Sequence, residues 1–410
     1  MSETRTSIAR YVQAFFITDK KLVSRQKWIL GLINLSAVVV FWVLSSFLVN
    51  SLVEDDSYRK PFFITYINTG CFCFYIIPYL KLENLTIKQF IENLKSDYQQ
   101  SYTRLRGSDE ESSVSGYGSN DDLQGLHSQQ AIASERLHVS ESGSDKSDDE
   151  TINTYETVKL SLQFIILWFS ANLVTNSSLS YTSVASQTIL SSTSSFFTLL
   201  IGYLQSIERI NQNKIVGILL SFTGVIIVTK IDSSADNPNS NDKSTLMIFY
   251  GNALALSGAL IYGIYTILLK QRITIKNSRR ERELNTHLFF GFVGIFCLVF
   301  LWPVLIILHY TGYETFELPP TRTIAWILFI NALVTFISDF CWCKAVLLTS
   351  PLTVTVGLSM TIPLAMVGDW LLKGFTVNIW YIFGAAIVTI GFWIINKDEE
   401  EDFVRDENSL

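Results

Sequence analysis

The stretch Leu288–Leu308, LFFGFVGIFCLVFLWPVLIIL, decides the class of fold. It contains no Asp, Glu, Lys or Arg. A helix rises about 1.5 Å per residue, so a run of this length crosses the roughly 30 Å hydrocarbon core of a bilayer. The stretch therefore predicts a membrane-spanning helix.

Similar apolar runs recur along the chain of 410 residues, which is 49% hydrophobic and holds 28 Phe, while the charged residues collect between the runs. We expect an all-α polytopic membrane protein with ten transmembrane helices, at residues 28–50, 62–80, 160–178, 182–205, 214–231, 246–269, 286–308, 324–343, 351–372 and 378–396. The resulting regions are a cytosolic N-terminus at 1–27, spans 1–2 at 28–80, a connection at 81–158, spans 3–5 at 159–231, spans 6–10 at 246–396 and an acidic C-terminus at 397–410.

Lys and Arg residues set the expected orientation. With a cytosolic N-terminus, 25 of the 31 fall on the cytosolic side of these spans. An excess of Lys and Arg marks cytosolic loops, so both termini and the 81–158 connection are expected in the cytosol.

The 81–158 connection is rich in Ser, Asp and Glu, and its part at 100–152 is expected to be disordered because it has little apolar surface to bury. Ser108, Ser119 and Ser147 each have an acidic residue three positions later, the pattern that acidophilic kinases favour. We regard these three as candidate phosphorylation sites. The alternative is that the connection is only a tether without a regulatory role.

A shift of 167 residues aligns one half of the chain with the other. Residues 182–227 then match 349–394 at ten positions, with Thr188 falling on Thr355 and Ser192 on Ser359. A duplicated unit of five spans inserts in opposite orientations, because five is odd. We therefore expect two inverted five-helix repeats, an arrangement typical of secondary transporters that work by alternating access.

Polar side chains inside the spans are the candidate lining of a substrate path. Thr188, Ser192 and Ser195 lie on one face of span 4, and Thr355 and Ser359 form the matching pair in span 9. Interhelical packing is the alternative interpretation of such hydroxyl groups.

Pro363 has no N–H to give, so we expect a kink in span 9 and an unpaired carbonyl at Ser359. Packing alone could also explain a kink.

Asp339 is the most informative charge within the spans, about one turn from the expected cytosolic end of span 8. Buried charges in membranes are expensive and mark functional sites, so Asp339 is a candidate for binding a cationic substrate or a coupling proton. Pairing with Lys344 or Ser338 is the alternative. Asn172 is a further polar candidate in span 3.

Four glycines repeat at a spacing of seven residues in spans 5 and 10: Gly217, Gly224, Gly384 and Gly391. Glycine lets helix backbones approach closely, so these positions predict packing contacts and no chemistry.

Several stretches resemble a known family: Glu54–Tyr66, Thr182–Leu190, Ser338–Trp342 and Leu348–Ala365. They are similar to the drug/metabolite transporter superfamily (EamA-like), and specifically to fungal vacuolar-membrane and thiamine-repressible transporter-like proteins related to the F branch of solute carrier family 35. The resemblance implies the ten-span inverted-repeat fold and a place in the fungal vacuole membrane, with the mitochondrial inner membrane or the Golgi and endoplasmic reticulum as alternatives. It leaves the substrate open.

The sequence predicts a secondary transporter of a small organic metabolite that is not an enzyme, because no phosphate-binding Gly loop, His-Glu-x-x-His or Gly-x-Ser-x-Gly motif occurs. We expect no cofactor, no metal and no nucleic acid. The expected partners are the lipid bilayer and a small-molecule substrate, and a second copy of the chain, forming a homodimer, is a further candidate partner. A membrane receptor or scaffold regulated through residues 100–152 is the competing interpretation.

Overall fold

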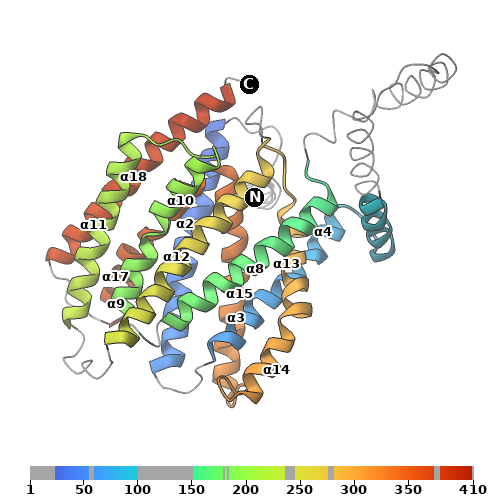
Figure 1. Ribbon diagram of the computed structural model, residues 1–410, viewed down its shortest axis with the longest axis horizontal. Helices are drawn as coiled ribbons and strands as arrows, with labels where there is room; N and C mark the ends of the chain where they lie inside the picture. Colours follow the sequence, from blue (N-terminus) through green and yellow to red (C-terminus); the bar gives the residue numbers. More distant parts are fainter. Residues whose placement is uncertain are drawn as a thin grey trace, which may run out of the picture.

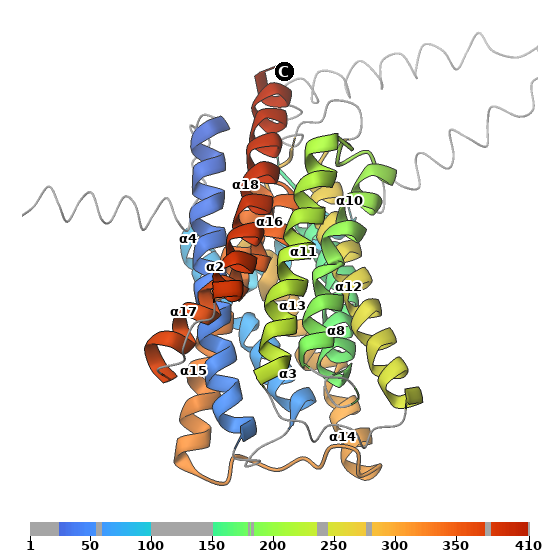
Figure 2. The ribbon, with the colours of Figure 1, turned by 90° about the vertical axis from the view of Figure 1, so that its left-hand side faces the viewer.

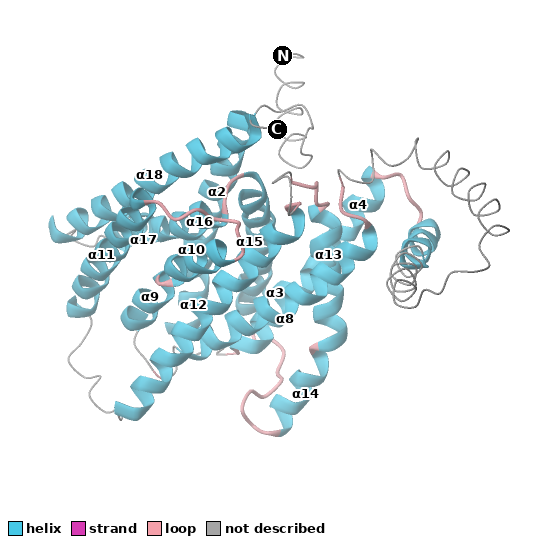
Figure 3. Cartoon of the chain, turned by 45° about the horizontal axis from the view of Figure 1, so that its top comes forward, coloured by secondary structure: helices cyan, strands magenta, loops and turns pink. Residues whose placement is uncertain are grey.

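The computed structural model describes residues 24–54, 60–99, 151–178, 181, 184–235, 245–275, 281–373 and 379–408. Within these residues the chain is helical and has no strands, only two isolated bridges, Thr151 with Glu283 and Thr274 with Glu281 (Figure 3). The helices, in chain order, are α2 Ser24–Glu54, α3 Pro61–Gly70, η1 Cys71–Tyr75, α4 Ile76–Leu82, α8 Thr154–Ser178, α9 Val184–Ser192, α10 Ser194–Leu204, α11 Gln212–Ala235, α12 Thr245–Ile273, α13 Thr286–Phe300, α14 Trp302–Tyr310, α15 Arg322–Leu348, α16 Pro351–Gly357, η2 Leu358–Met360, α17 Thr361–Lys373 and α18 Ile379–Asn408.

In the described part of the chain, seven helical stretches are long and apolar enough to cross a membrane: Ser24–Ser46, Phe62–Leu82, Thr154–Ser178, Gln212–Lys230, Leu246–Ile273, Thr286–Tyr310 and Arg322–Leu348. A shorter apolar stretch covers Pro351–Ala365. The chain is thus an all-helical membrane protein.

Several of the expected straight spans are interrupted. Span 4 divides at Thr193 into α9 and α10, and span 9 divides into α16, η2 and α17 just before Pro363. Span 7 bends at Leu301, where Pro303 lies in the first turn of α14. Proline cannot donate a backbone hydrogen bond, which accounts for the interruptions beside Pro303 and Pro363.

Side chains cap the starts of α13, α15 and α16. Asn285 accepts a hydrogen bond from the backbone of Leu288, Thr321 from Ile324, and Ser350 from Thr353. These caps satisfy N–H groups that the first helical turn leaves without a partner. They fix the starts of α13, α15 and α16.

The bundle is held by long pairs of helices (Figure 1). α2 packs along α15, α8 along α12, and α11 along α18, while α13 crosses η1. The largest buried cluster combines aliphatic with aromatic side chains, among them Phe72, Phe164, Phe289, Phe290 and Trp342.

The start of α2 and the end of α18 lie at the same end of the bundle (Figure 2). Arg25 at the start of α2 lies 3.7 Å from the Glu400 carboxylate near the end of α18, and the rings of Trp28 and Phe403 are 5.4 Å apart. We call this end, where the chain leaves α18, the C-terminal end of the bundle.

Two segments outside the expected spans are helical. Residues 397–408, in the expected acidic C-terminus, continue α18, and their charged side chains pair with α11 and the loop before it. Residues 87–99 of the 81–158 connection are helical, starting at a Thr86 backbone N–H that donates to Gln89. Phe90 explains this order, since it packs against Tyr79 and Phe292.

Most of the segment expected to be disordered, including Ser108, Ser119 and Ser147, lies outside the described residues. Its last two residues, Thr151 and Ile152, are described. Ile152 is buried and donates its backbone N–H to the carbonyl of Glu283. The expectation of disorder is therefore wrong for this end of the connection.

Candidate functional site

The two hydroxyl-bearing spans meet where α10 contacts α16. The hydroxyl oxygens of Thr198 and Thr355 are 3.3 Å apart, and both residues are buried. Thr355 also donates to the carbonyl of Pro351 at 2.7 Å, one turn earlier in α16. The contact therefore joins the two halves of the chain through a pair of hydroxyl groups.

The three predicted residues of span 4 lie on both sides of the break at Thr193. Thr188 and Ser192 are in α9 and are partly exposed, whereas Ser195 is in α10 and is buried. The Ser192 hydroxyl donates to the carbonyl of Ile189 at 2.7 Å, and the Ser195 hydroxyl donates to the carbonyl of Ser192 at 3.0 Å. Both serine hydroxyls are thus engaged within their own span.

Ser359 lies in η2, and Pro363 lies in the first turn of α17. The expected kink occurs here as a tightened 3₁₀ turn. The expected unpaired carbonyl of Ser359 is not found, because a backbone N–H at the end of η2 donates to it. The same N–H, that of Thr361, also donates to the carbonyl of Leu358, three residues earlier, which is the spacing of a 3₁₀ turn.

Exposure changes along both broken spans. Residues 351–357 are all buried, whereas residues 358–365 are all partly exposed. Residues 187–194 are likewise partly exposed at every position, and buried residues begin at Ser195. The hydroxyl groups are therefore covered near the C-terminal end of the bundle and more open toward the other end.

Asp339 lies deeper than the sequence indicated. The expected span 8 ended at residue 343, but α15 continues to Leu348, so the carboxylate is about 13 Å from the helix end at about 1.5 Å per residue. Asp339 is 6% exposed, and its Oδ2 atom has no hydrogen-bond partner. No ion pair joins it to Lys344 among the described residues, and the hydroxyl of Ser338 is also without a partner.

Aromatic side chains from three helices surround this carboxylate. It lies within electrostatic range of the phenol groups of Tyr75, Tyr262 and Tyr265. Trp342, one turn later on α15, donates its indole N–H to the Tyr262 hydroxyl at 3.0 Å. A buried carboxyl group beside aromatic rings can hold a proton or a cationic group.

The remaining predicted residues lie apart from this region. The Asn172 amide donates to the carbonyl of Trp168 in its own helix at 2.8 Å. Gly217 and Gly224 of α11 face Gly391 and Gly384 of α18, and a Cβ added at any of the four would come within 3.2 Å of the opposite backbone. The four glycines thus lie in the α11–α18 contact.

Three residues of this region were missed by sequence reasoning. Thr198 continues the face of Ser195 at a spacing of three, so helical periodicity could have included it. Trp342 ends the family-like stretch Ser338–Trp342, which gave it no role of its own, and Tyr262 carries no signal in the sequence that separates it from other aromatic residues of a membrane span.

Comparison with known proteins gives consistent matches. Residues 148–230 match the EamA-like transporter family. An uncharacterized vacuolar membrane protein of Saccharomyces cerevisiae is 46% identical over 94% of this chain and 94% of that protein. A thiamine-repressible mitochondrial transport protein of the same yeast is 38% identical over 92% of this chain and 94% of that protein. Solute carrier family 35 member F5 of Pongo abelii is 29% identical over 90% of this chain and 77% of that protein.

One solved crystal structure superimposes on this chain with a TM-score of 0.57, over 90% of this chain and 98% of the other. The two sequences are 9% identical, so this likeness concerns the fold alone.

Proposed function

Because this chain belongs to the EamA-like transporter family, in the group of the fungal transporters and solute carrier family 35 member F5, we propose that it is a secondary transporter of a small organic metabolite that works by alternating access. The single observation that carries the proposal is Asp339, a carboxylate deep in a membrane helix with an oxygen that lacks a partner. Such a charge is costly in a membrane unless it binds something.

The proposed architecture is ten transmembrane helices in two inverted repeats of five. The helix pairs support it. In the two repeats α2 corresponds to α12, and α8 corresponds to α15. The pair α2–α15 therefore corresponds to the pair α12–α8, and both pairs are present. The same exchange maps the α11–α18 pair onto itself, with Gly217 opposite Gly391 and Gly224 opposite Gly384. A pseudo-two-fold axis in the membrane plane would have this effect.

The proposed substrate path runs between α9–α10 and α16–α17, past the Thr198–Thr355 contact, with Asp339 beside it. Hydroxyl groups and one carboxylate suit a small polar or cationic solute, and protonation of Asp339 would couple its movement to a proton. The relatives support an endomembrane location, and the yeast vacuolar membrane protein with 46% identity favours the vacuole. The mitochondrial relative makes the mitochondrial inner membrane the alternative.

The test begins with metabolite profiling of vacuoles isolated from cells with and without the protein. A solute whose vacuolar content changes is then offered to proteoliposomes that contain the wild-type chain, Asp339→Asn or the neighbouring control Ser338→Ala. We expect Asp339→Asn to abolish uptake and Ser338→Ala to retain it. Unchanged uptake by Asp339→Asn would remove Asp339 from the mechanism.

Deleting residues 100–152 separates transport from a scaffold role. A transporter should keep its flux without this segment, whereas a scaffold that works through it would lose function and show no flux in either form.

A further inference from the structure

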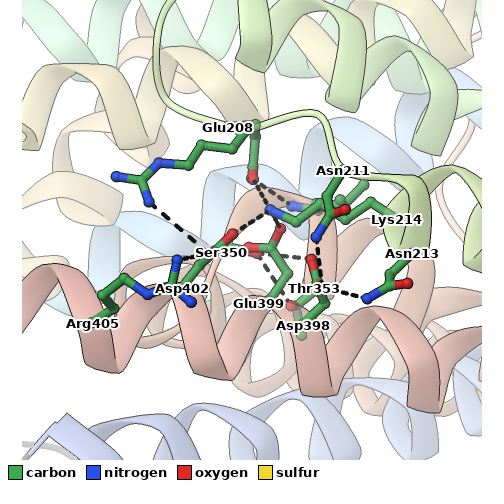
Figure 4. A network of polar contacts seen from close by, with 12 residues as sticks. Glu208, Asn211, Asn213, Lys214, Ser350, Thr353, Asp398, Glu399, Asp402 and Arg405 are labelled. Carbon is green, nitrogen blue, oxygen red and sulfur yellow. Dashed lines mark hydrogen bonds and ion pairs between the residues drawn. The ribbon is translucent and has the colours of Figure 1, made fainter.

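Four charged side chains form a buried cluster at the C-terminal end of the bundle (Figure 4). They are Glu208, from the loop between α10 and α11, Lys214, from the first turn of α11, and Glu399 and Asp402, from the end of α18. The first three are at most 4% exposed. The Lys214 ammonium pairs with Glu399, lies 3.0 Å from Asp402 Oδ2 and lies 4.0 Å from Glu208 Oε2. We call these four residues the charge cluster.

Further contacts hold the end of α18 against the loop before α11. The amides of Asn211 and Asn213 both donate to Asp398 Oδ1 at 3.0 Å. From the other side, the Trp28 indole donates to Asn396 Oδ1 at 3.2 Å. The last turns of α18 are therefore fixed to three parts of the bundle at once.

Glu208 links the charge cluster to a membrane span. Its Oε1 accepts the backbone N–H of Leu352 at 3.2 Å, in the first turn of α16. This N–H is one of those that a helix start leaves unpaired. α16 carries Thr355, whose hydroxyl meets Thr198 on α10, so the position of Glu208 determines how the start of α16 sits against α10.

A second buried cation holds the chain just before α16. Lys270, at the end of α12, donates to the carbonyls of Val346, Leu347 and Thr349 at 3.3, 3.2 and 2.8 Å. Val346 and Leu347 lie in the last turn of α15, and Thr349 lies in the connection to α16. An ammonium group thus holds the chain just before α16, and the Glu208 carboxylate holds the first turn of α16.

From these contacts we infer that the charge cluster is the latch that closes the substrate path at the C-terminal end of the bundle, with Glu208 as a positioning residue that acts through α16. The inference rests on the proposed function and adds the part of the chain that controls access. Residues 351–357 are buried beneath the latch, whereas residues 358–365, farther from it, are partly exposed. Opening this end requires the Lys214 ion pairs and the Glu208–Leu352 hydrogen bond to break together.

The latch makes the end of α18 a moving part of the transporter. Lys214 is the cation that the buried carboxylates of Glu208 and Glu399 share. Without it the carboxylate of Glu208, in the loop before α11, loses the ammonium group that links it to the carboxylate of Glu399 on α18. The loop before α11 should then separate from α18 and release Leu352.

Labelling of a cysteine at position 355 tests the latch without a transported substrate. The full chain carrying Thr355→Cys is placed in sealed vesicles with its C-terminus outside, and a membrane-impermeant maleimide is added outside. Mass spectrometry then measures the labelling rate at each cysteine. We expect slow labelling in the otherwise wild-type chain and an increase of about tenfold with Lys214→Met, the change in an equilibrium that about 1.4 kcal/mol produces.

Two further variants and one native cysteine make the result decisive. Glu208→Ala, which removes the Leu352 contact but keeps Lys214 paired, should also speed labelling, and Lys214→Arg should not. If Lys214→Met does not fold, Glu208→Ala decides alone. Cys297 is buried in α13 and serves as the internal control. An equal rise in the labelling of Cys297 would indicate general unfolding and overturn the proposal. Unchanged labelling at position 355 would overturn it as well.

The latch and the proposed function can fail separately. A chain that shows the labelling change but moves no solute contradicts transport and leaves the latch in place. A chain that moves solute but shows no labelling change contradicts the latch alone.

Discussion

Replacing Gly224 with alanine should loosen the contact between α11 and α18. An added Cβ would lie 2.7 Å from the Gly384 carbonyl oxygen and 2.8 Å from the Val388 nitrogen, where ordinary contact begins at 3.4 Å. Both atoms are backbone, so the helices must separate by about 0.7 Å, the difference between 3.4 and 2.7 Å. Overpacking of this kind costs about 1–3 kcal/mol, and the better helix propensity of alanine offsets about 1 kcal/mol. We expect a net loss of about 1 kcal/mol.

Unfolding of the purified chain by SDS in mixed micelles measures this loss. Gly70→Ala is the matched control, because its Cβ would meet only the flexible side chain of Leu298, at 2.9 Å. The control should therefore be neutral or slightly stabilising, because no backbone overlap offsets the better helix propensity of alanine. If Gly224→Ala were as stable as Gly70→Ala, the close approach of α11 and α18 would not limit packing, and the reasoning would be wrong.

Three further outcomes follow from polar contacts. The Glu314 carboxylate accepts two backbone N–H groups at the start of α3, at 2.8 and 3.0 Å. Glu314→Gln should therefore lower the free energy of unfolding by about 1–2 kcal/mol in the same SDS titration. An unchanged midpoint would argue against this cap. Thr198→Val and Thr355→Val, alone and together, should show a coupling of about 0.6 kcal/mol, whereas strictly additive losses would mean that the two hydroxyls do not interact. Burial, and then the neighbouring Glu399 carboxylate, raise the pKa of Glu208 well above its usual range. The folded state therefore binds more protons there than the unfolded state, so stability should fall as pH rises from about 4.3 through the raised value. Glu208→Gln should flatten this dependence in thermal midpoints taken between about pH 5 and pH 8, and an equally steep curve would contradict it.

Helix positions could be predicted from the sequence because a bilayer sets the length of an apolar run. Leu288–Leu308 falls within α13 and α14, as expected for a span. The break at Thr193 could not be predicted, since neither proline nor glycine lies there. The helical continuation of α18 was also missed, because its acidic residues resemble a solvated tail until Lys214 is placed beside them.

The candidate site was only partly predictable. Asp339 could be found because a carboxylate inside an apolar run is rare, but its depth depends on where α15 ends. Glu208 lies in a loop and looks like any surface acid. Its burial comes from Leu352, 144 residues later, and no local pattern reports so distant a contact.

The pairing of α2 with α15 has a consequence for how the protein is made. Residues 55–321 separate the end of α2 from the start of α15, and at about 5–20 residues per second their synthesis takes roughly 15–50 s. During that time α2 is in the bilayer without its partner, and Ser45 cannot yet donate to Asn331, a bond of 2.6 Å in the finished protein. The newly made N-terminal half must therefore be sheltered by lipid or by the membrane-insertion machinery until the ribosome has delivered α15.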